Sequence, residues 1–210
     1  MKIIKRKICA ITGSDDLEEL HTFANYPLFM GCTDQPFEKD LSFDMEWVIS
    51  KSSGTIQLAK LIPLEVLYSE IHNSVIGNIW KKHHKDFADF IKKFEPKIGV
   101  LEIGGAHGYL SKIYQNDIKI PWTIIEPNPS PIDGCNANFI KGNFSLALIK
   151  DINFDLIVHS HVLEHIYDPN EFFKLLFKVI KNKGKVIFSI PNMSVMLEKK
   201  YTNCINFEHT

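Results

Sequence analysis

Apolar residues follow different patterns along this chain, and the changes between them suggest how it is organised. In residues 1–74 they form short runs such as Lys7–Ile11 and Phe43–Ile49, separated by glycine and proline, which predicts short strands and turns. In residues 75–95 they recur at three- and four-residue steps, with lysines on the other side, which predicts an amphipathic helix with the apolar face Ile76, Ile79, Trp80, Phe87, Phe90, Ile91 and Phe94. In residues 96–210 short apolar runs alternate with helical patterns. We therefore expect a small N-terminal lobe (1–74), a connecting helix (75–95) and a larger domain (96–210).

The alternating part of the chain predicts a parallel β-sheet. Its expected strands are Ile98–Ile103, Trp122–Ile125, Asn138–Ile140, Phe154–His159 and Lys185–Ile190. The first is apolar apart from Glu102, as in a strand whose two faces are both covered. One helix is expected over Tyr109–Gln115, and another begins at Asp168-Pro169 and should bury Phe172, Phe173, Leu175, Leu176, Val179 and Ile180. The predicted fold class is α/β with a doubly wound sheet, beside a small, mostly β N-terminal lobe.

Composition and charge exclude several classes of function. The 210 residues are 45% hydrophobic, enough for a buried core, and the net charge of −1 provides no basic footprint for a nucleic-acid partner. No apolar run approaches the roughly 18 residues that span a bilayer, so we expect no membrane partner. The cysteines are widely scattered, unlike those of a disulfide-rich secreted fold: Cys9, Cys32, Cys135 and Cys204. We expect a cytoplasmic protein.

The segment Ile98–Leu110 carries the main chemical signal. An apolar strand containing Glu102 runs into a glycine-rich turn, which leads into a helix. Such a turn lets the backbone approach a nucleotide, and the free N–H groups of the first helical turn face the ligand. A dinucleotide turn needs glycine at its first, third and sixth positions, which here are Gly104, Ala106 and Tyr109. The turn therefore predicts a nucleotide-like ligand and argues against a dinucleotide.

The pattern E-x-G-x-A-x-G from Glu102 to Gly108 resembles motif I of the class I S-adenosylmethionine-dependent methyltransferases, with Ala106 where many members carry glycine. The pieces FDLIV and HVLEH within residues 154–165 resemble motif IV of that family. The resemblance implies a Rossmann-like fold, S-adenosyl-L-methionine as cofactor and S-adenosyl-L-homocysteine as product. Glu126, about 20 residues after the turn, is expected to accept charge-assisted hydrogen bonds from the ribose hydroxyls. The other implied cofactor-binding residues are Glu102, Gly104, Gly105, Ala106, Gly108, Tyr109, Pro127, Asn143, Phe144 and His159.

The N-terminal part resembles the small zinc-binding lobe of bacterial sugar C-methyltransferases. The corresponding turns are Cys9-Ala-Ile-Thr12-Gly13 and Ser50-Lys-Ser-Ser53-Gly54, followed by Gln57-Leu58. Three of the four expected thiolates are replaced by Thr or Ser, and structural zinc needs four good nitrogen or sulfur ligands. We therefore expect the lobe to fold without zinc. In that family the next segment runs across the cofactor mouth and contributes to the pocket. Tyr68, His72 and His84 are therefore candidates for the pocket wall. The alternative is that Tyr68 is a packing residue and the histidines lie at the surface.

Histidines and acids after the fourth predicted strand are the catalytic candidates. Methyl transfer requires alignment of donor and acceptor and usually the removal of a proton from the acceptor, for which histidine is suited at neutral pH. His161 and His165 are candidate bases, and Glu208-His209 resembles the acid–histidine segment over the acceptor site of sugar methyltransferases.

Two other interpretations of these residues stay open. A helical turn would place His161, Glu164 and His165 on one side. Glu164 and His165 could cap or brace the loop, because the HVLEH segment is frequent in the resembled superfamily. The same group could instead hold a divalent ion together with His209, as an E-x-x-E-H arrangement and a later histidine do in some O-methyltransferases. Our prediction includes no metal.

Together these resemblances predict an S-adenosylmethionine-dependent methyltransferase that O-methylates a small-molecule acceptor. The expected acceptor is a sugar or a phosphorylated intermediate of surface-polysaccharide or natural-product biosynthesis. The alternatives are C-methylation of a nucleotide-linked sugar and a non-catalytic cofactor-binding module. The family's sheet continues with a sixth and a seventh strand that this sequence does not supply, so we expect a domain that is incomplete at its C-terminus. The sheet edge left exposed would favour a homodimer.

Overall fold

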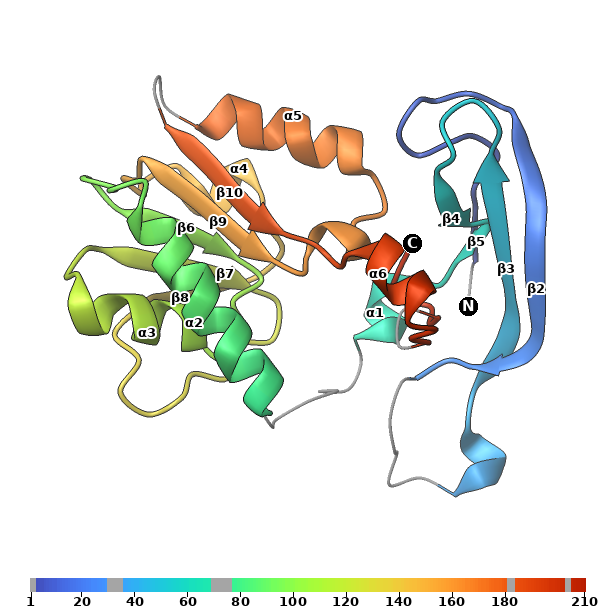
Figure 1. Cartoon of the computed structure of the whole chain (residues 1–210), viewed down its shortest axis with the longest axis horizontal. Coiled ribbons are helices and arrows are strands. Elements are labelled where there is room, and N and C mark those ends of the chain that lie inside the picture. Colours follow the sequence, from blue (N-terminus) through green and yellow to red (C-terminus); the bar gives the residue numbers. More distant parts are fainter. Residues whose placement is uncertain (1–2, 30–35, 69–76, 181–183, 203–204) are drawn as a thin grey trace. The chain divides into compact units, whose positions relative to one another are not determined.

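The structure, a computed structural model, describes residues 3–29, 36–68, 77–180, 184–202 and 205–210 (Figure 1). The expectations for Cys32, His72, Ile76 and Cys204 lie outside these residues. The chain packs as two compact units. The lobe unit comprises Met1–His72, Glu164–Asn170 and Pro191–Thr210, and the sheet unit comprises Asn73–Leu163 and Glu171–Ile190. The boundaries expected at residues 75 and 96 follow sequence patterns, whereas these units are defined by packing.

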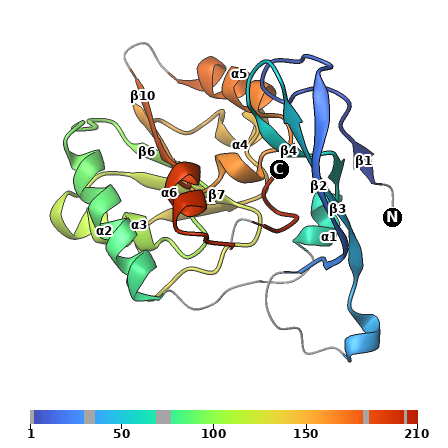
Figure 2. The same cartoon turned by 45° about the vertical axis from the view of Figure 1, so that its right-hand side comes forward.

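The sheet unit is built on a five-stranded parallel sheet in the order β10-β9-β6-β7-β8. The strands are β6 (Val100–Ile103), β7 (Trp122–Glu126), β8 (Asn138–Lys141), β9 (Leu156–Ser160) and β10 (Lys185–Ser189). Figures 1 and 2 show these strands side by side, with helices on both faces. The first strand of this sheet, β6, is its central strand. The chain then adds β7 and β8 on one side of β6, and afterwards β9 and β10 on the other. The predicted α/β, doubly wound fold class is therefore confirmed.

Helices α2 (Asn78–Lys92) and α3 (Tyr109–Asp117) cover one face of the sheet, and α5 (Pro169–Val179) covers the other. A single core on the first face joins residues of α2 and α3 to Val158 of β9. The next residue along β9, His159, points to the opposite face because successive strand residues alternate, and its ring contacts Phe172 of α5. A short helix, α4 (Leu146–Ile149), follows β8.

The buried apolar faces of α2 and α5 contain fewer residues than the sequence predicted. In α2 only Phe87 and Ile91 of the expected stripe are buried, whereas Ile79 is 85% exposed and Phe90 is 45% exposed. In α5, Phe172 and Leu176 are buried, but Phe173 is 39% exposed. The predictions for these exposed residues were wrong because one residue turns a helix by about 100°, so a broad apolar stripe exceeds the contact surface.

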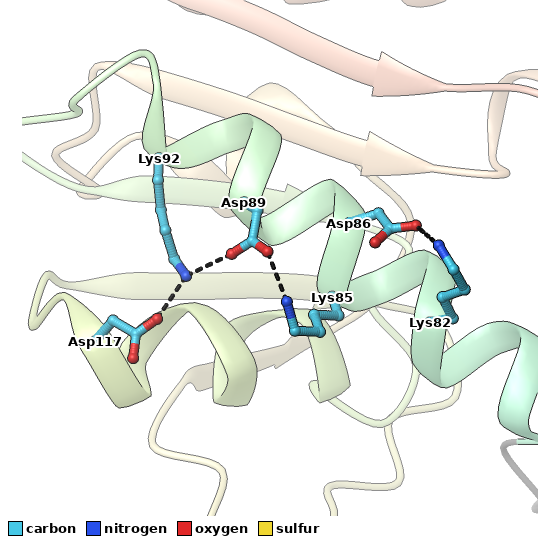
Figure 3. A network of polar contacts seen from close by, with 6 residues as sticks. All are labelled: Lys82, Lys85, Asp86, Asp89, Lys92 and Asp117. Atoms are coloured by element: carbon cyan, nitrogen blue, oxygen red, sulfur yellow. Dashed lines mark hydrogen bonds and ion pairs between the residues drawn. The ribbon is translucent and has the colours of Figure 1, made fainter.

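The outer face of α2 carries a network of ion pairs (Figure 3). Lys82 pairs with Asp86, and Lys85 pairs with Asp89 at 2.9 Å, both one helical turn apart. Lys92 contacts Asp89 at 2.8 Å and Asp117 of α3 at 2.5 Å. Exposed ion pairs of this kind each contribute little to stability, because water screens them. The predicted lysine face is a solvated, charge-paired surface.

The lobe unit is mostly β. Its three-stranded antiparallel sheet has the order β2-β3-β4, formed by β2 (Leu17–Pro27), β3 (Ser42–Ser50) and β4 (Ile56–Leu58). Elsewhere β1 (Ile4–Lys5) pairs with β5 (Lys60–Leu61). The remaining helices are α1 (Leu64–Leu67), α6 (Met193–Glu198) and the 3₁₀ helices η1 (Phe37–Lys39) and η2 (Leu163–His165).

The strand expected over Lys7–Ile11 does not form. The end of this run, from Cys9, belongs to the first of the two predicted zinc-lobe turns, Cys9–Gly13, which is closed by a hydrogen bond from Gly13 N–H to Cys9 O at 2.9 Å. The longest strand of the lobe, β2, lies instead in an acidic stretch with mostly exposed side chains, so its hydrophobic pattern is weak. Strand formation here follows from pairing with β3 rather than from local pattern.

The core of the lobe unit is closed by the end of the chain. Phe207 is 1% exposed, and its ring lies edge-on to Tyr26 and Phe43 at centroid distances of 6.2 and 6.4 Å. It packs with a cluster of buried aliphatic residues: Leu28, Met45, Leu58, Leu61, Ile62 and Leu67. Across the described part of the chain, no helix combines the length and apolar character that crossing a membrane requires.

Candidate functional site

The order of the strands places the topological switch point of the sheet between β6 and β9. In open α/β sheets, ligands bind at the carboxyl ends of the strands beside this point. At this end β6 continues into the turn Gly104–Gly108, and β9 is followed by His161. The two segments are in contact, because a Cβ at Gly104 would lie only 2.5 Å from Val162 Cγ2. The glycine turn and the His161 segment therefore border the same end of the sheet.

The turn has a left-handed backbone at three positions. The φ angles are +72° at Gly104, +39° at Ala106 and +70° at Gly108, which precedes the first residue of α3. A Cβ at Gly108 would lie 2.4 Å from Cys135 Sγ and 2.9 Å from Phe139 Cζ, so a side chain here would have to displace these neighbours. At Ala106 the left-handed conformation costs roughly 1–2 kcal/mol. The Ala106 N–H donates to Glu126 Oε2 at 3.1 Å, which offsets part of that cost.

Glu126 lies at the carboxyl end of β7 and braces the turn. One carboxylate oxygen accepts the Ala106 N–H, and the other accepts the Asn128 N–H at 3.0 Å. An ionised carboxylate has about four acceptor positions, so two remain for further donors such as the hydroxyls of a ribose. The free acceptor positions of this carboxylate fit the ribose hydroxyls of the nucleoside expected from the sequence. Pro127, the next residue, is exposed.

Glu102 lies beneath the turn rather than at its surface. Its side chain is buried, and Oε2 accepts a hydrogen bond from Trp122 Nε1 at 2.7 Å. Burial, with a smaller contribution from the charge of Glu126, raises the pKa of Glu102 to about 7. A Cβ at Gly105 would meet the Glu102 carboxyl group at 2.8 Å. Glu102 therefore supports the backbone of the turn from below, and its direct contact with a cofactor stays a prediction.

The residues predicted for the adenine side differ in exposure. Asn143 is exposed, and the half-buried Phe144 has its ring 5.9 Å from that of Phe172. His159 is fully buried, with its ring stacked on Phe188 at 5.0 Å and edge-on to Phe172 at 5.5 Å. Their contacts with a cofactor stay predictions.

Histidines gather at the carboxyl ends of β9 and β10. The His161 ring lies edge-on to Trp80 at 4.9 Å and to His83 at 5.1 Å, both from α2. The backbone of His161 is left-handed, with φ +53°, and its N–H donates to Ser189 O at 3.0 Å. Left-handed non-glycine residues cost about 1–3 kcal/mol and cluster at functional sites. The backbone of His161 is therefore strained, and its ring is held in a defined position by Trp80 and His83.

A chain of polar contacts continues from this ring. His83 Nε2 lies 2.8 Å from Ser160 Oγ, which lies 2.8 Å from Ser189 Oγ. The half-buried His84, a predicted pocket-wall residue, packs against Tyr109 at 5.6 Å. Burial, with His83 and His161 adding, lowers the pKa of His84 to about 4, and burial also lowers the pKa of His83.

Sequence reasoning missed four residues of this group: Trp80, His83, Ser160 and Ser189. His83 and Trp80 lie one residue and four residues before His84, on a helix that the sequence had predicted. Ser160 directly follows the predicted strand Phe154–His159, and Ser189 is the second-last residue of the predicted strand Lys185–Ile190. The sequence predicted the helix and the strands near which these residues lie, but it did not show that the fold brings the four residues together.

The other catalytic candidates belong to the lobe unit. His165 Nδ1 lies 3.0 Å from Glu208 O, and the rings of His165 and His209 are 5.0 Å apart. The buried Asn206 accepts the N–H groups of Glu208 and His209 through Oδ1, each at 2.9 Å. Glu164, His165 and His209 each offer one ligand atom, and these atoms lie within 4.8 Å of one another. Of the described residues, these three have ligand atoms close enough together that they could hold a metal ion.

The helical turn expected over His161–His165 does not include His161. The helix η2 covers Leu163–His165 only, because the left-handed backbone of His161 cannot continue it. His161 belongs to the sheet unit, whereas Glu164 and His165 belong to the lobe unit. The expectation of one helical face shared by the three was wrong.

The positions that correspond to zinc ligands do lie together in the lobe. Cys9 Sγ accepts the Thr12 N–H at 3.4 Å and lies 3.6 Å from Ser53 Oγ, which donates to Ser50 Oγ at 3.0 Å. One thiol and three hydroxyls do not fit structural zinc.

Asp16, which the sequence did not single out, completes this hydroxyl cluster. Its carboxylate accepts hydrogen bonds from Ser14 Oγ at 2.5 Å, Ser50 Oγ at 2.9 Å and Ser52 N–H at 2.7 Å. These bonds lower the pKa of Asp16 well below its ordinary value. Hydrogen bonds thus join the two turns that zinc joins in the resembled lobe.

Comparisons with known proteins identify the family. A family model described as a methyltransferase domain matches residues 79–209, more than half of the chain. The plantazolicin methyltransferase BpumL, solved with S-adenosylhomocysteine (SAH), is 18% identical with a TM-score of 0.43, covering 54% of this chain and 48% of that chain. The glycopeptide N-methyltransferase MtfA, complexed with S-adenosylmethionine (SAM), is 17% identical with a TM-score of 0.40, covering 50% and 53%. Coclaurine N-methyltransferase, bound to N-methylheliamine and SAH, is 14% identical with a TM-score of 0.43, covering 57% and 38%.

The chain spans about half the length of the first solved structures that it matches. No protein of curated function matches the sequence.

Proposed function

Because the chain belongs to the methyltransferase-domain family, we propose that it is a SAM-dependent methyltransferase acting on an oxygen of a small-molecule acceptor. The observation that carries the proposal is the glycine turn at the switch point, braced by the Glu126 carboxylate. When bound, SAM supplies an electrophilic methyl group on a positively charged sulfur.

The residues of the turn would bind the cofactor. Glycine at positions 104, 105 and 108 lets a ligand approach the backbone, and Tyr109 begins the helix whose first N–H groups face that end. Glu126 retains acceptor positions for the ribose hydroxyls. Pro127 follows the carboxyl end of β7, and Asn143 and Phe144 follow the carboxyl end of β8. Glu102 and His159 lie buried below this surface and would support it.

His161 is our first choice for the group that takes the acceptor proton. It follows β9 directly beside the turn, because its neighbour Val162 contacts Gly104. A neutral imidazole is a competent base near pH 7. His165, Glu208 and His209 remain further candidates for base or substrate contact from the lobe unit, and their hydrogen bonds to Asn206 and to each other give them defined positions.

The acceptor class follows from the resemblance of the lobe to sugar methyltransferases. We propose a sugar or a phosphorylated intermediate of surface-polysaccharide or natural-product biosynthesis. O-methylation is preferred because the zinc-lobe cysteines typical of the C-methylating group are replaced here. The strand β10 ends the described sheet, so a homodimer through this edge is part of the same proposal.

Calorimetric titration with SAH tests cofactor binding, which the methyltransferase and the non-catalytic binding module both require. We expect a saturable, enthalpically detectable complex, and absence of binding at millimolar ligand would refute the proposal. Transfer of labelled methyl from SAM to nucleotide sugars and phosphorylated acceptors then tests catalysis. A product methylated on carbon would establish the alternative C-methyltransferase, and binding without turnover would favour a non-catalytic module.

The variant His161→Ala tests the proposed base. We expect a rate at least 100-fold lower with an unchanged SAH dissociation constant, since general base catalysis contributes about 10²–10⁴. His21→Gln in the lobe is the matched control and should leave both quantities unchanged. Full activity of His161→Ala would remove it as the base.

A further inference from the structure

The contacts of His83 suggest a role that the sequence did not reveal. Its Nε2 atom lies 2.8 Å from Ser160 Oγ and 3.5 Å from Ser189 Oγ, and the two serine oxygens are 2.8 Å apart. Ser160 and Ser189 are the last residues of β9 and β10 and are paired in register. The imidazole therefore lies over a pair of hydroxyls at the carboxyl end of the sheet, where a ligand is expected.

The direction of Ser160 follows from the pleat of β9. His159 points to the face covered by α5, so Ser160 points to the opposite face, which α2 covers. His83 comes from α2 and stacks on Phe87, one turn further along, at 6.0 Å. Phe87 is buried in the core, so the position of the imidazole is set by core packing rather than by a surface rotamer.

The same three residues surround the proposed base. His161 N–H donates to Ser189 O at 3.0 Å, and its ring lies edge-on to His83 at 5.1 Å. Val162, the next residue, contacts Gly104 of the cofactor turn. The hydroxyl pair thus lies between the segment that borders the turn and an imidazole that can accept a proton.

We propose that Ser160 and His83 form a proton relay for the acceptor, which rests on the proposed function and deepens it. The acceptor hydroxyl gives its proton to Ser160 Oγ, while the Ser160 hydroxyl proton moves to His83 Nε2. The acceptor oxygen keeps the electron pair with which it bonds to the methyl carbon, and the pair of the broken carbon–sulfur bond stays on sulfur. The positive charge ends on the His83 imidazolium, which then loses its proton to water. Ser189 holds the Ser160 hydroxyl in line. In this relay the acceptor proton goes to His83 in place of His161, the first-choice base of the proposed function, and His161 positions the acceptor.

The groups around His83 agree with an imidazole that is neutral before reaction. Asp86 and His84 face it from α2, His161 from the end of β9, Ser189 from β10, and Tyr109 of α3 packs behind His84. Burial and then His161 lower its pKa, while Asp86 raises it slightly; the net direction is down. A relay also requires that the proton of the neutral ring sits on Nδ1, so that Nε2 carries a lone pair toward Ser160.

Long-range proton–nitrogen NMR of the ¹⁵N-labelled full chain tests this requirement without an acceptor. With the His83 signal assigned by His83→Gln, we expect a neutral ring at pH 7 with the proton on Nδ1, both in the free chain and with SAH. In Ser160→Ala the preference for that tautomer should be lost. A proton on Nε2, or a His83 ring that is charged at pH 7, would overturn the relay.

Turnover with an acceptor found in the methyl-transfer screen provides the second readout. His83→Gln and Ser160→Ala should each lower kcat by about 100-fold or more and leave the SAH dissociation constant within twofold, while His21→Gln changes neither. Full kcat in Ser160→Ala would refute the relay. Failure of the unmodified chain to bind SAH would instead refute the proposed function, so the two failures are distinguishable.

Discussion

Replacement of Glu126 by alanine tests the nucleoside site most directly. Both carboxylate oxygens accept one backbone N–H each, from Ala106 and Asn128 at 3.1 and 3.0 Å. These two donors belong to exposed residues, so water can replace the lost acceptor in the free chain. We therefore expect little change in the stability of the free chain.

The bound state should respond differently. A hydrogen bond to a charged group contributes about 1.5–3 kcal/mol, and a donor buried under a ligand has no water to replace it. At about 1.4 kcal/mol per tenfold, Glu126→Ala should weaken SAH binding roughly 10- to 150-fold. Glu126→Gln is the matched control, because it keeps one carbonyl acceptor and the side-chain volume. It should lose affinity by about tenfold or less.

Calorimetric titration with SAH and thermal unfolding of the free variants measure the two effects separately. Unchanged affinity in Glu126→Ala would show that the carboxylate does not face the ribose. If instead the melting temperature of the free variant falls strongly, and the loss of SAH affinity is no larger than this loss of stability explains, then Glu126 acts by stabilising the fold of the turn.

Three further predictions concern stability, each measured by urea unfolding. Gly108→Ala should destabilise the chain by about 1–3 kcal/mol more than Gly134→Ala. The φ angles of the two glycines are similar, +70° and +74°, but a Cβ at position 108 would lie 2.4 Å from Cys135 Sγ, whereas one at position 134 would have its nearest neighbour, Lys112 Nζ, at 3.5 Å; equal losses would contradict the close packing. Phe207→Ala should cost about 3–5 kcal/mol, since this 1% exposed ring closes the lobe core, whereas a loss below about 1 kcal/mol would mean that the chain end is not part of that core. Glu102 has a pKa raised from 4.5 to about 7 by burial, so the folded state holds a proton that the unfolded chain releases, and stability should fall by up to about 3 kcal/mol as the pH rises from 4.5 through 7. Glu102→Gln should remove this dependence, and an unchanged pH profile would refute the assignment.

Local patterns predicted the sheet unit well because each of its elements is specified by neighbouring residues. The apolar run that contains Glu102 forms β6, and Asp168-Pro169 starts α5. The same reasoning failed where a partner decides the outcome. Lys7–Ile11 is apolar but forms a turn, and acidic Leu17–Pro27 is a strand because β3 pairs with it.

The candidate site was only half visible in the sequence. The cofactor turn is contiguous from Glu102 to Gly108, so its motif is readable from local spacing. His83, Ser160 and Ser189 are separated by 77 and 29 positions, and no spacing rule connects them. Their approach depends on how α2 packs on the sheet.

The sequence by itself therefore determined the order of strands and helices in the sheet unit, the glycine turn and the acid that follows it, because alternation, turn chemistry and short motifs act over a few residues. The tertiary structure alone decided that His83 lies over Ser160, that Phe207 completes the lobe core, and that Asp16 joins two turns that lack zinc ligands. These contacts join positions far apart in the chain. They form because burying apolar surface and satisfying polar groups are properties of the packed whole rather than of any one segment.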